Sequence, residues 1–539
     1  MKFIFVSGGV VSGLGKGISS ASIALLLQSK GIRVTNVKID MYLNVDAGTI
    51  RPQEHGEVFV TEDGTETDQD LGNYERFLNK SLRRENYITT GQVYKSVIDK
   101  ERAFFYQGED VEAIPHITDE IIDRIKKAGK VNKAEAVIIE LGGTVGEYQN
   151  CLFFEASRIL KLKQSKDVLQ VHVSYLPFIK SIGELKSKPV QQSVQKLNSM
   201  GIQPDFLIVR SEKGIDKRRR DRLALFCNMK DEDIISNPDL ASIYEVPVFL
   251  NKQKLAEKII KKLDLKTKKS DYLDKWTAFV DKEKKAKDVV KIGIVGKYFA
   301  TGDYNLGDAY VCVLEAIKQA SAEVGVKTEM VWIRAEDLEE EDGEKILADF
   351  GGVVVPQGWG KRGVEGKIKA VKYARENKVP YLGLCFGMQM AVIEIARNVL
   401  GMKGANSVEV NPKTKYPVVH IMPDQEEYLK NKQYGGTIRL GNWTCKIKRG
   451  SLLAKIYGRK KVVEERHRHR YEFNNKYRKV FEKEGVVFSG LSPDGKLVEA
   501  IELKNHPFFV GTQFHPEYRS RPLDLHPIFV EFVKAVKLI

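Results

Sequence analysis

Residues 2–39, KFIFVSGGVVSGLGKGISSASIALLLQSKGIRVTNVKI, decide the fold of the first half of this chain. Residues 2–6 form an apolar run that predicts a buried strand, and residues 18–30 predict a helix that ends at Gly31. Residues 32–39, after this glycine, predict the next strand. A strand, a glycine-rich turn, a helix and a second strand in this order are typical of a parallel α/β sheet.

The same alternation extends along the rest of the chain in two blocks. The first block continues with short apolar runs, which predict strands at 136–139, 169–173, 206–209 and 246–250. The second block predicts strands at 291–296, 352–355, 379–384 and 507–513, and a helix at 386–400. The sequence therefore predicts the α/β fold class, with two doubly wound parallel-sheet domains.

A lysine-rich segment without glycine, residues 254–287, separates the two blocks. Such a charged stretch is typical of a solvated linker that carries a helix or two. We therefore divide the chain into a first domain, 1–265, a linker, 266–289, and a second domain, 290–539. The length of 539 residues agrees with two large domains or about three average ones.

Composition excludes several classes of protein. The five cysteines are few and scattered, which argues against a disulfide scaffold or a zinc ribbon and favours a reducing, cytoplasmic environment. The chain has no run of about 18 apolar residues, so we expect no membrane anchor. The net charge of +15 is diffuse, apart from basic clusters at 217–220 and 459–461 without interleaved aromatic residues. This pattern favours a solvated lysine-rich surface, and we expect no nucleic-acid partner.

Glycines crowd the turn between the first strand and the first helix, in GGVVSGLGKG at 8–17. They allow backbone N–H groups to surround a polyphosphate at a helix N-terminus, where Lys16 can neutralise its charge. The turn departs from the usual phosphate-loop pattern, because five residues separate Gly9 from Gly15 and Gly17 replaces the Mg²⁺-binding Ser or Thr. A glycine-rich turn is often only a turn, but the lysine between strand and helix favours nucleotide binding.

A metal ion in this domain would need carboxylates from elsewhere. Asp68 and Asp70 lie in an acidic loop, and Glu140 follows the strand predicted at 136–139. The carboxyl ends of parallel strands meet at one edge of a sheet, which directs Glu140 to the same crevice as the phosphate loop. Carboxylates in that crevice suit Mg²⁺. Asp68 is equally consistent with a solvated loop acid, and we interpret His172, within an apolar strand, as structural.

A cysteine on a sharp turn marks a second chemical site. In YLGLCFGMQ, 381–389, a G-x-C-x-G pattern follows a predicted strand and opens a helix, which places the Cys385 thiol at a helix N-terminus. A cysteine in an apolar run is more often inert core. However, His515 and Glu517 in QFHPE follow another strand and complete a set of nucleophile, base and orienting carboxylate. The loop PQGWG, 356–360, is a candidate source of an oxyanion-binding N–H.

Ten motifs together resemble the CTP synthase family, in that family's order and over nearly the whole chain. In the first domain they are SGGVVSGLGKG, KIDMYLNVDAGT, HGEVFVTEDGTETDQDLGNYERF, IELGGTVGE, GELKSKPVQQSV and SIYEVP. In the second domain they are GLCFGMQ, GGTIRLG, RHRHRYEFNN and QFHPE. The resemblance implies a P-loop-like amidoligase (synthetase) domain followed by a class I glutamine amidotransferase domain.

The resemblance also implies a reaction at two sites, the final step of de novo CTP synthesis. Glutamine is hydrolysed through a thioester on Cys385, with His515 as base and Glu517 as its orienting partner, and ammonia passes inside the protein to the synthetase site. There ATP phosphorylates the 4-oxygen of UTP, and ammonia displaces phosphate to give CTP. Lys16 and Lys38 would stabilise charge on the transferred phosphoryl group.

The remaining site residues are implied by their positions in the family's motifs. ATP would be bound by Gly13, Leu14, Gly15, Lys16, Gly17, Ile18 and Asp70, and Mg²⁺ by Asp70 and Glu140. UTP or CTP would contact Ser12, Glu147, Tyr148, Gln149, Lys186, Ser187, Lys188, Pro189, Val190, Gln191 and Arg222. Glutamine would contact Gly358, Phe386, Gly387, Met388, Gln389, Glu409 and Arg470.

The family is activated by GTP, inhibited by CTP and assembles as a tetramer, and we expect the same here. The segment KRGVEG, 361–366, resembles the lid near the family's GTP site. The sequence departs from the family's usual pattern in three places. Gln357 and Trp359 replace Gly and Phe in a PGGFG loop, Arg222 replaces a lysine that contacts UTP, and residues 147–149 are Glu-Tyr-Gln rather than Asp-Ile-Glu.

Two other interpretations stay open from the sequence. An ATP-dependent amidoligase acting on a cobyrinate-like acid shares the unusual phosphate loop, but it does not require GELKSKPVQQSV. A nucleic-acid-associated P-loop switch with a degenerate amidase domain would bind DNA in a salt-dependent manner. The complete set of Cys385, His515 and Glu517 argues against such degeneration.

Overall fold

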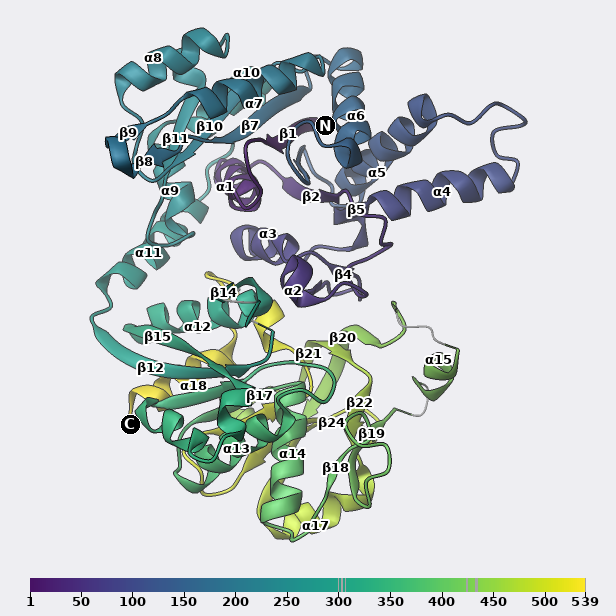
Figure 1. Cartoon of the computed structure of the whole chain (residues 1–539), viewed down its shortest axis with the longest axis vertical. Helices are drawn as coiled ribbons and strands as arrows, with labels where there is room; N and C mark the ends of the chain where they lie inside the picture. The colour runs from purple at the N-terminus through teal and green to yellow at the C-terminus, as the bar shows by residue number, and fades with distance from the viewer. Residues whose placement is uncertain (299, 302–303, 306, 423–424, 432–434, 539) are drawn as a thin grey trace. The chain divides into compact units, whose positions relative to one another are not determined.

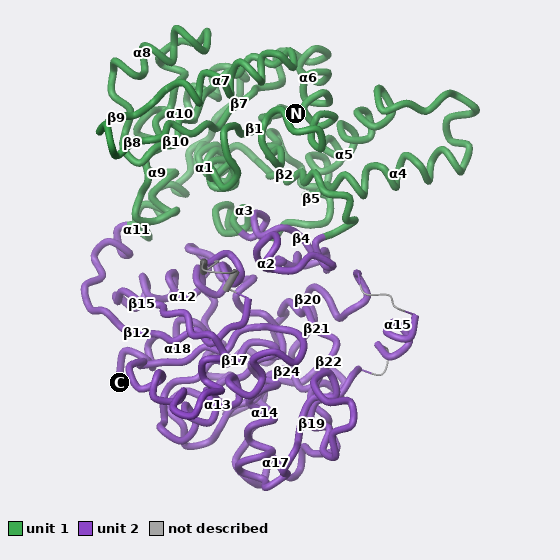
Figure 2. Tube along the Cα trace, in the orientation of Figure 1, with its two compact units in different colours: residues 1–46, 73–280 green, residues 47–72, 281–539 purple. Residues whose placement is uncertain are grey.

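The computed structural model describes residues 1–298, 300–301, 304–305, 307–422, 425–431 and 435–538. Contacts divide the chain into two compact units, which Figure 2 shows in different colours. The first unit comprises residues 1–46 and 73–280, and the second comprises residues 47–72 and 281–539. The sequence prediction placed residues 47–72 inside the first domain, whereas their contacts assign them to the second unit.

Hydrogen bonds attach residues 47–72 to the second unit. The Asn442 N–H donates to the Glu62 carbonyl at 2.9 Å, and the Tyr518 hydroxyl donates to the Val58 carbonyl at 3.0 Å. These partners are hundreds of residues apart in sequence, so no local pattern could predict the association. The elements of the segment are α2 (Pro52–His55) and a short hairpin of β3 (Phe59–Val60) and β4 (Glu66–Thr67).

The first unit is built on a seven-stranded sheet with the order β11-β10-β7-β1-β6-β2-β5, in which every adjacent pair of strands is parallel (Figure 1). Its strands are β1 (Lys2–Gly8), β2 (Val34–Asp40), β5 (Tyr87–Thr89), β6 (Ala136–Leu141), β7 (Val168–Tyr175), β10 (Phe206–Ser211) and β11 (Ile234–Pro238). β1 lies in the middle of the sheet, and residues 3–6 are at most 2% exposed. A continuous apolar run is typical of a strand that is covered on both faces.

Helices connect these strands, as expected for a doubly wound sheet. They are α1 (Lys16–Gln28), α3 (Asp70–Leu78), α4 (Thr90–Arg102), α5 (Thr118–Val131), α6 (Cys151–Lys163), α7 (Lys188–Ser199), α8 (Lys217–Phe226), α9 (Glu245–Lys252), α10 (Leu255–Leu263) and α11 (Tyr272–Lys285). A small hairpin pairs β8 (Phe178–Ile179) with β9 (Glu184–Leu185). Within the described ranges of the whole chain, no helix is long and apolar enough to cross a membrane.

One predicted strand is a helix. Residues 246–250 lie in α9, and the outermost strand of the sheet is β11. Val246 and Leu250 are both buried, and their spacing of four residues fits one face of a helix. Periodicity cannot distinguish a short buried strand from a buried piece of helix. The strand prediction at 246–250 is therefore wrong.

The segment predicted as a solvated linker contains a helix with a buried face. Within 266–289, α11 carries Trp276, whose side chain is fully buried. The Trp276 indole N–H donates to the Tyr244 carbonyl at 2.8 Å, and its ring centroid lies 5.0 Å from that of Phe77. This helix therefore contributes to the core of the first unit as well as connecting the chain.

Replacing Trp276 with alanine is expected to lower the free energy of unfolding of the first unit by about 3–5 kcal/mol, because a large buried ring is lost and a cavity remains. Urea unfolding of the full chain, followed by circular dichroism, measures the shift. Leu162→Ala is the control, since Leu162 is 74% exposed. The Leu162→Ala substitution should change the free energy of unfolding by no more than about 0.5 kcal/mol. Equal shifts in the two variants would contradict the packing role of α11.

The second unit is built on a nine-stranded mixed sheet, with the order β15-β12-β16-β17-β25-β24-β23-β20-β21. The first five strands in this order, β15, β12, β16, β17 and β25, are parallel, as expected for the predicted parallel sheet. The other four, β24, β23, β20 and β21, extend the sheet with antiparallel pairs. The strands are β12 (Asp288–Gly296), β15 (Val326–Arg334), β16 (Gly352–Val355), β17 (Tyr381–Leu384), β20 (Arg439–Ile447), β21 (Val462–His469), β23 (Val486–Leu491), β24 (Val498–Leu503) and β25 (Phe509–Thr512).

Helices and small sheets complete the second unit. The helices are α12 (Val311–Val324), α13 (Val364–Glu376), α14 (Phe386–Asn398), α15 (Glu426–Lys430), α16 (Leu452–Ile456), α17 (Arg478–Lys483) and α18 (Pro527–Lys537). The short strands are β13 (Ala300–Thr301), β14 (Tyr304–Asn305), β18 (Asn406–Ser407), β19 (Pro417–Ile421) and β22 (Tyr471–Phe473). β12, β16, β17 and β25 are parallel neighbours, so the loops at their carboxyl ends meet at one edge of the sheet.

Candidate active site

Cys385 occupies a sharp turn between β17 and α14, with a backbone φ of 50° and ψ of −96°. The flanking positions require glycine for lack of space. A Cβ at Gly383 would lie 2.7 Å from the Tyr381 hydroxyl, and one at Gly387 would lie 1.9 Å from the Val355 carbonyl oxygen. The glycines of the G-x-C-x-G pattern are thus explained by the close packing of this turn. Cys385 is 5% exposed and lies directly before the first residue of α14.

His515 and Glu517 follow β25 and form a buried pair, with His515 Nδ1 and Glu517 Oε1 2.7 Å apart. Burial alone would lower the pKa of His515, but the charges of Glu517 and Cys385 outweigh it and raise the pKa to about 10. The His515 ring stacks on Tyr518, with centroids 4.9 Å apart. The Gln513 amide donates to Cys385 Sγ at 3.4 Å. These contacts fix the imidazole and favour its protonated form.

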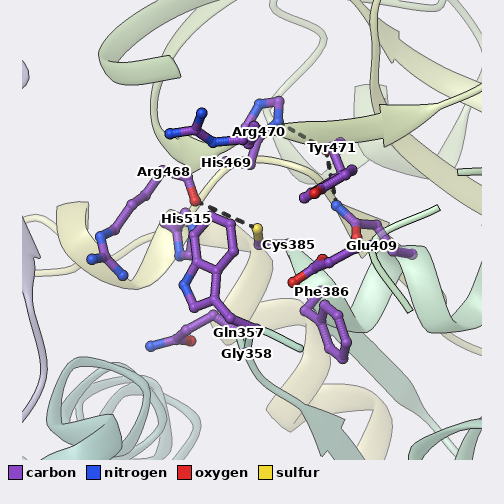
Figure 3. A pocket seen from close by; sticks show the side chains of 12 residues that line it. Gln357, Gly358, Cys385, Phe386, Glu409, Arg468, His469, Arg470, Tyr471 and His515 are labelled. Carbon is purple, nitrogen blue, oxygen red and sulfur yellow. Dashed lines mark hydrogen bonds between the residues drawn. The ribbon is translucent and has the colours of Figure 1, made fainter. Parts of the chain in front are cut away.

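A small pocket surrounds the thiol, and Figure 3 shows the side chains that line it. The Glu409 carboxylate accepts the Gly360 N–H at 2.7 Å, and burial raises its pKa. The Arg470 guanidinium is buried and donates to Thr437 Oγ1 at 2.9 Å. A carboxylate and a guanidinium in one pocket suit the ammonium and carboxylate of an amino acid.

Most residues predicted to contact glutamine line this pocket, namely Gly358, Phe386, Gln389, Glu409 and Arg470. Gln389 is held by a hydrogen bond from its amide to the Tyr471 carbonyl at 3.0 Å. Gly387 and Met388 are not among the lining residues. The Met388 side chain is fully buried in the hydrophobic core, so only its backbone is available to a ligand.

In the first unit, α1 begins at Lys16, directly after Gly15 with its left-handed φ of 82°. Lys16 Nζ donates to the Gly143 carbonyl, just beyond β6, at 2.6 Å. A Cβ at Gly8 would lie 2.6 Å from Lys16 Cδ, so this glycine makes room for the lysine. The ammonium group thus lies at the carboxyl ends of two adjacent strands, beside a helix N-terminus suited to phosphate.

Lys38 and Glu140 are register partners on β2 and β6, and both are buried. Lys38 Nζ lies 3.1 Å from Glu140 Oε1 and 3.8 Å from Asp40 Oδ1. The Tyr74 hydroxyl also donates to the Glu140 carboxylate. The structure therefore brings together two of the residues that the sequence assigned to phosphoryl transfer and metal binding.

Asp68 and Asp70 belong to the segment 47–72 and thus to the second unit. The Asp70 N–H donates to Asp68 Oδ1 at 2.7 Å, and Asp68 Oδ2 lies 3.0 Å from His55 Nε2. Asp68 is 5% exposed, which does not fit a solvated loop acid. Coordination of one metal by Asp70 and Glu140 stays a prediction.

The residues predicted to contact UTP or CTP lie in loops and helix starts of the first unit. Ser12 is in the exposed turn after β1, and residues 186–191 span the start of α7. Glu147 caps its own turn by accepting the Thr144 N–H at 2.7 Å. Tyr148 is 97% exposed. Their ligand contacts stay predictions.

Other predicted nucleotide contacts are restricted by burial or packing. The side chains of Leu14 and Val190 are buried, so only their backbones are available to a ligand. Arg222 on α8 lies over the ring of Phe226, with its guanidinium carbon 5.4 Å from the ring centroid. An arginine that stacks in this way differs in shape from a lysine.

His172 has the structural role that the sequence suggested. Its ring lies between Ser7 Oγ, 2.9 Å from Nδ1, and Ser193 Oγ, 2.6 Å from Nε2. Burial lowers its pKa to about 3, with a smaller contribution from Lys16. Gly9 is also explained here, because a Cβ would lie 1.8 Å from Ser193 Oγ.

Comparisons with known proteins agree over almost the whole chain. Residues 2–265 match the family model described as CTP synthase N-terminus, and residues 305–535 match glutamine amidotransferase class-I. A CTP synthase of Caldanaerobacter subterraneus subsp. tengcongensis is 49% identical over 99% of this chain and 98% of its own length. A CTP synthase of Methanocaldococcus jannaschii is 50% identical over 99% of this chain and 98% of its own length.

The chain belongs to the CTP synthase family. It is accordingly a glutamine-hydrolysing, ATP-dependent ligase that aminates UTP to CTP. A solved structure, Trypanosoma brucei CTPS glutaminase domain with bound acivicin, is 37% identical over 46% of this chain and 94% of that chain, with a TM-score of 0.43.

The sequence motifs did not predict a role for two buried lysines beside the pocket of this CTP synthase family member. Lys297, which follows β12, donates to the carbonyl of Gly360 at 3.0 Å and to that of Trp359. Lys367 on α13 donates to the Pro356 carbonyl at 3.0 Å. Burial lowers the pKa of Lys297 to about 8 and holds the pKa of Lys367 well below its ordinary value.

These lysines hold the carbonyl groups of loop 356–360, and no local motif marks a lysine for such a role. The loop has further partners, since the Trp359 N–H donates to Tyr298 Oη at 2.7 Å. Across the described parts of the chain, no hydrogen bond engages the N–H of Gly358. The predicted oxyanion donor is therefore available while its neighbours are held.

Proposed function

We propose that Cys385 is the nucleophile of the glutaminase reaction, with His515 as acid and base and Glu517 as its orienting partner. One observation carries this proposal. Cys385 and His515, which follow β17 and β25, line one pocket with Glu409 and Arg470, and Glu517 pairs with His515. That combination supplies a nucleophile, a proton carrier and counter-charges for both ends of an amino acid.

Glutamine hydrolysis follows from this geometry. The Cys385 thiolate attacks the amide carbon, and the Gly358 N–H stabilises the oxyanion. The His515 imidazolium gives its proton to the departing nitrogen, so ammonia leaves and a glutamyl thioester remains. His515 then takes a proton from water, which attacks the thioester and releases glutamate and the thiol. Glu517 keeps the imidazole oriented and stabilises its charged form.

The synthetase step is proposed for the first unit. ATP transfers its γ-phosphoryl group to the 4-oxygen of UTP, because phosphate is a far better leaving group than the original oxygen. Ammonia, passed within the protein, then displaces phosphate and yields CTP. Lys16 at the start of α1 and Lys38 on β2 would stabilise the negative charge of the transferred group.

A Mg²⁺ ion fits the donor chemistry proposed for this step. Glu140 and Asp70 offer carboxylate oxygens, which are the ligands that Mg²⁺ prefers. Glu140 is buried and already bonded to Lys38 and Tyr74, so a rearrangement of these bonds would accompany metal binding. When bound, the ion would neutralise phosphate charge.

The finer properties of the family are also proposals for this chain. They are activation by GTP, feedback inhibition by CTP, assembly into a homotetramer and a cytoplasmic location. The segment 361–366, proposed as a lid near GTP, includes the start of α13. In this segment, Arg362 Nε lies 3.4 Å from Glu336 Oε1. The nucleic-acid-associated alternative requires the protein to bind DNA in a salt-dependent manner. If the protein does not bind DNA at any salt concentration, that alternative is excluded.

The decisive experiment follows the conversion of UTP to CTP by ultraviolet absorbance, with ATP and Mg²⁺, using glutamine in one arm and ammonium salt in the other. We expect CTP from both nitrogen sources, and faster glutamine hydrolysis when GTP is added. CTP from ammonium alone would contradict the glutaminase proposal. The absence of CTP from either source, in a protein shown to be folded, would overturn the assignment of UTP and favour another amidoligase substrate.

A further inference from the structure

Residue 357 joins the oxyanion loop to a buried carboxylate that neither the motifs nor the comparisons assign. The Gln357 amide donates to Glu57 Oε1 at 2.6 Å. Glu57 Oε2 accepts the Cys312 N–H at the start of α12, at 2.7 Å. Glu57 is 3% exposed and Gln357 is 8% exposed, so both groups are shielded from competing water. The carboxylate thus connects the loop to a helix N-terminus.

We propose that Glu57, acting through Gln357, is a positioning residue for the oxyanion loop in glutamine hydrolysis. The inference rests on the proposed function of Cys385 and Gly358. Gln357 directly precedes Gly358, whose N–H would stabilise the oxyanion, so anchoring the Gln357 side chain restricts the backbone that carries this donor. The Gln357 carbonyl is restrained as well, since it accepts the Tyr310 hydroxyl at 3.3 Å.

The anchor is suited to this task because each group in it is itself fixed. The Glu57 N–H donates to the Asp308 carbonyl at 2.8 Å, which ties the backbone of Glu57 to the same region as Cys312. A hydrogen bond to a charged acceptor is shorter and stronger than one between neutral groups. A glycine at position 357, as in the resembling family loop, would have no side chain to make this contact.

The anchor also has a titratable component. Burial raises the pKa of Glu57 to about 7, against the opposing effect of the Cys312 N–H. The charged or titratable groups that interact with Glu57 are Glu517 and Tyr518 after β25, Tyr310 before α12, and Cys312. Glu57 is ionised above pH 7 and accepts strongly from Gln357, whereas protonation below pH 7 weakens the bond. Protonation of Glu57 should therefore lower kcat for glutamine hydrolysis as the pH falls through about 7.

The test uses the full chain and compares Gln357→Ala, Glu57→Gln and the double variant. We expect kcat for glutamine hydrolysis to fall about tenfold in Gln357→Ala, which removes the donor, and by less than that but more than twofold in Glu57→Gln, which replaces the charged acceptor with a neutral one. KM should change little, and the double variant should fall no further than Gln357→Ala, because all three act on the same hydrogen bond. The decrease of kcat near pH 7 should be absent from Glu57→Gln. Glu502→Gln is the matched control, since Glu502 is another buried carboxylate that accepts helix N–H groups, those of Leu452 and Leu453.

Two further measurements separate positioning from general damage. CTP formation from ammonium should be unchanged in these variants, which shows that the synthetase site of the first unit is intact. Alkylation of Cys385 by iodoacetamide should keep its wild-type rate, because this reaction forms no oxyanion. Independent losses that multiply in the double variant, or a kcat within twofold of wild type, would overturn the inference. A wild-type protein that hydrolyses no glutamine would instead overturn the proposed function, and the inference with it.

Discussion

Replacing Cys385 with alanine is expected to abolish CTP formation from glutamine and to leave CTP formation from ammonium intact. The alanine cannot form the thioester, and no other cysteine lines the pocket among its described residues. We expect glutamine hydrolysis to fall by at least about 10³-fold, as is usual when a covalent nucleophile is removed. Ammonium supplies the same nitrogen without hydrolysis, so the synthetase reaction should keep its rate.

The measurement is the rate of CTP formation with each nitrogen source, together with glutamate release. Cys151→Ala is the matched control, because Cys151 is an exposed cysteine at the start of α6 in the first unit. It should retain both activities. Glutamine-dependent synthesis by Cys385→Ala at more than a few per cent of the wild-type rate would rule out Cys385 as the nucleophile. Loss of both activities would indicate that the substitution disturbs more than the thiol.

Much of the glutaminase site could be predicted from sequence because its constraints are local. Cys385 and its flanking glycines, Gly383 and Gly387, stand together in one short motif, even though a Cβ at Gly387 would meet the Val355 carbonyl of another strand. His515 and Glu517 are also close in sequence, and both follow a strand. The parallel order of the strands then brings the two motifs to the same edge of a sheet.

The parts that sequence could not predict depend on distant contacts. Glu57 lies in a segment assigned to the first domain by its motif, yet it contacts Gln357, 300 residues away. Lys297 and Lys367 are ordinary lysines in sequence, and only the fold places them against carbonyl groups of one loop. The strand predicted at 246–250 failed for another reason, because its short apolar pattern fits a buried helix equally well.

The prediction for the synthetase site concerns Lys16. Lys16→Ala is expected to lower CTP formation by about 10²–10³-fold with either nitrogen source, because the variant lacks the cation that stabilises the transferred phosphoryl group. Glutamine hydrolysis at Cys385 should persist. Lys16→Ala should thus lose CTP formation with both nitrogen sources and keep glutamine hydrolysis, whereas Cys385→Ala should lose glutamine hydrolysis and keep CTP formation from ammonium. The two variants together assign each half reaction to its own set of residues.

The control for Lys16 is a second lysine near the same helix. Lys30, just beyond the end of α1, makes a surface ion pair with Glu257 at 2.6 Å, and Lys30→Ala should keep the wild-type rate. Lys16 instead is 8% exposed, stands at the end of the glycine-rich turn 8–17, and donates to the Gly143 carbonyl in the separate turn after β6. Its ammonium group can leave this carbonyl for a phosphate oxygen of higher charge. If Lys16→Ala made CTP at the rate of Lys30→Ala, the glycine-rich turn could not be the site of phosphoryl transfer, and its spacing would be only that of a tight turn.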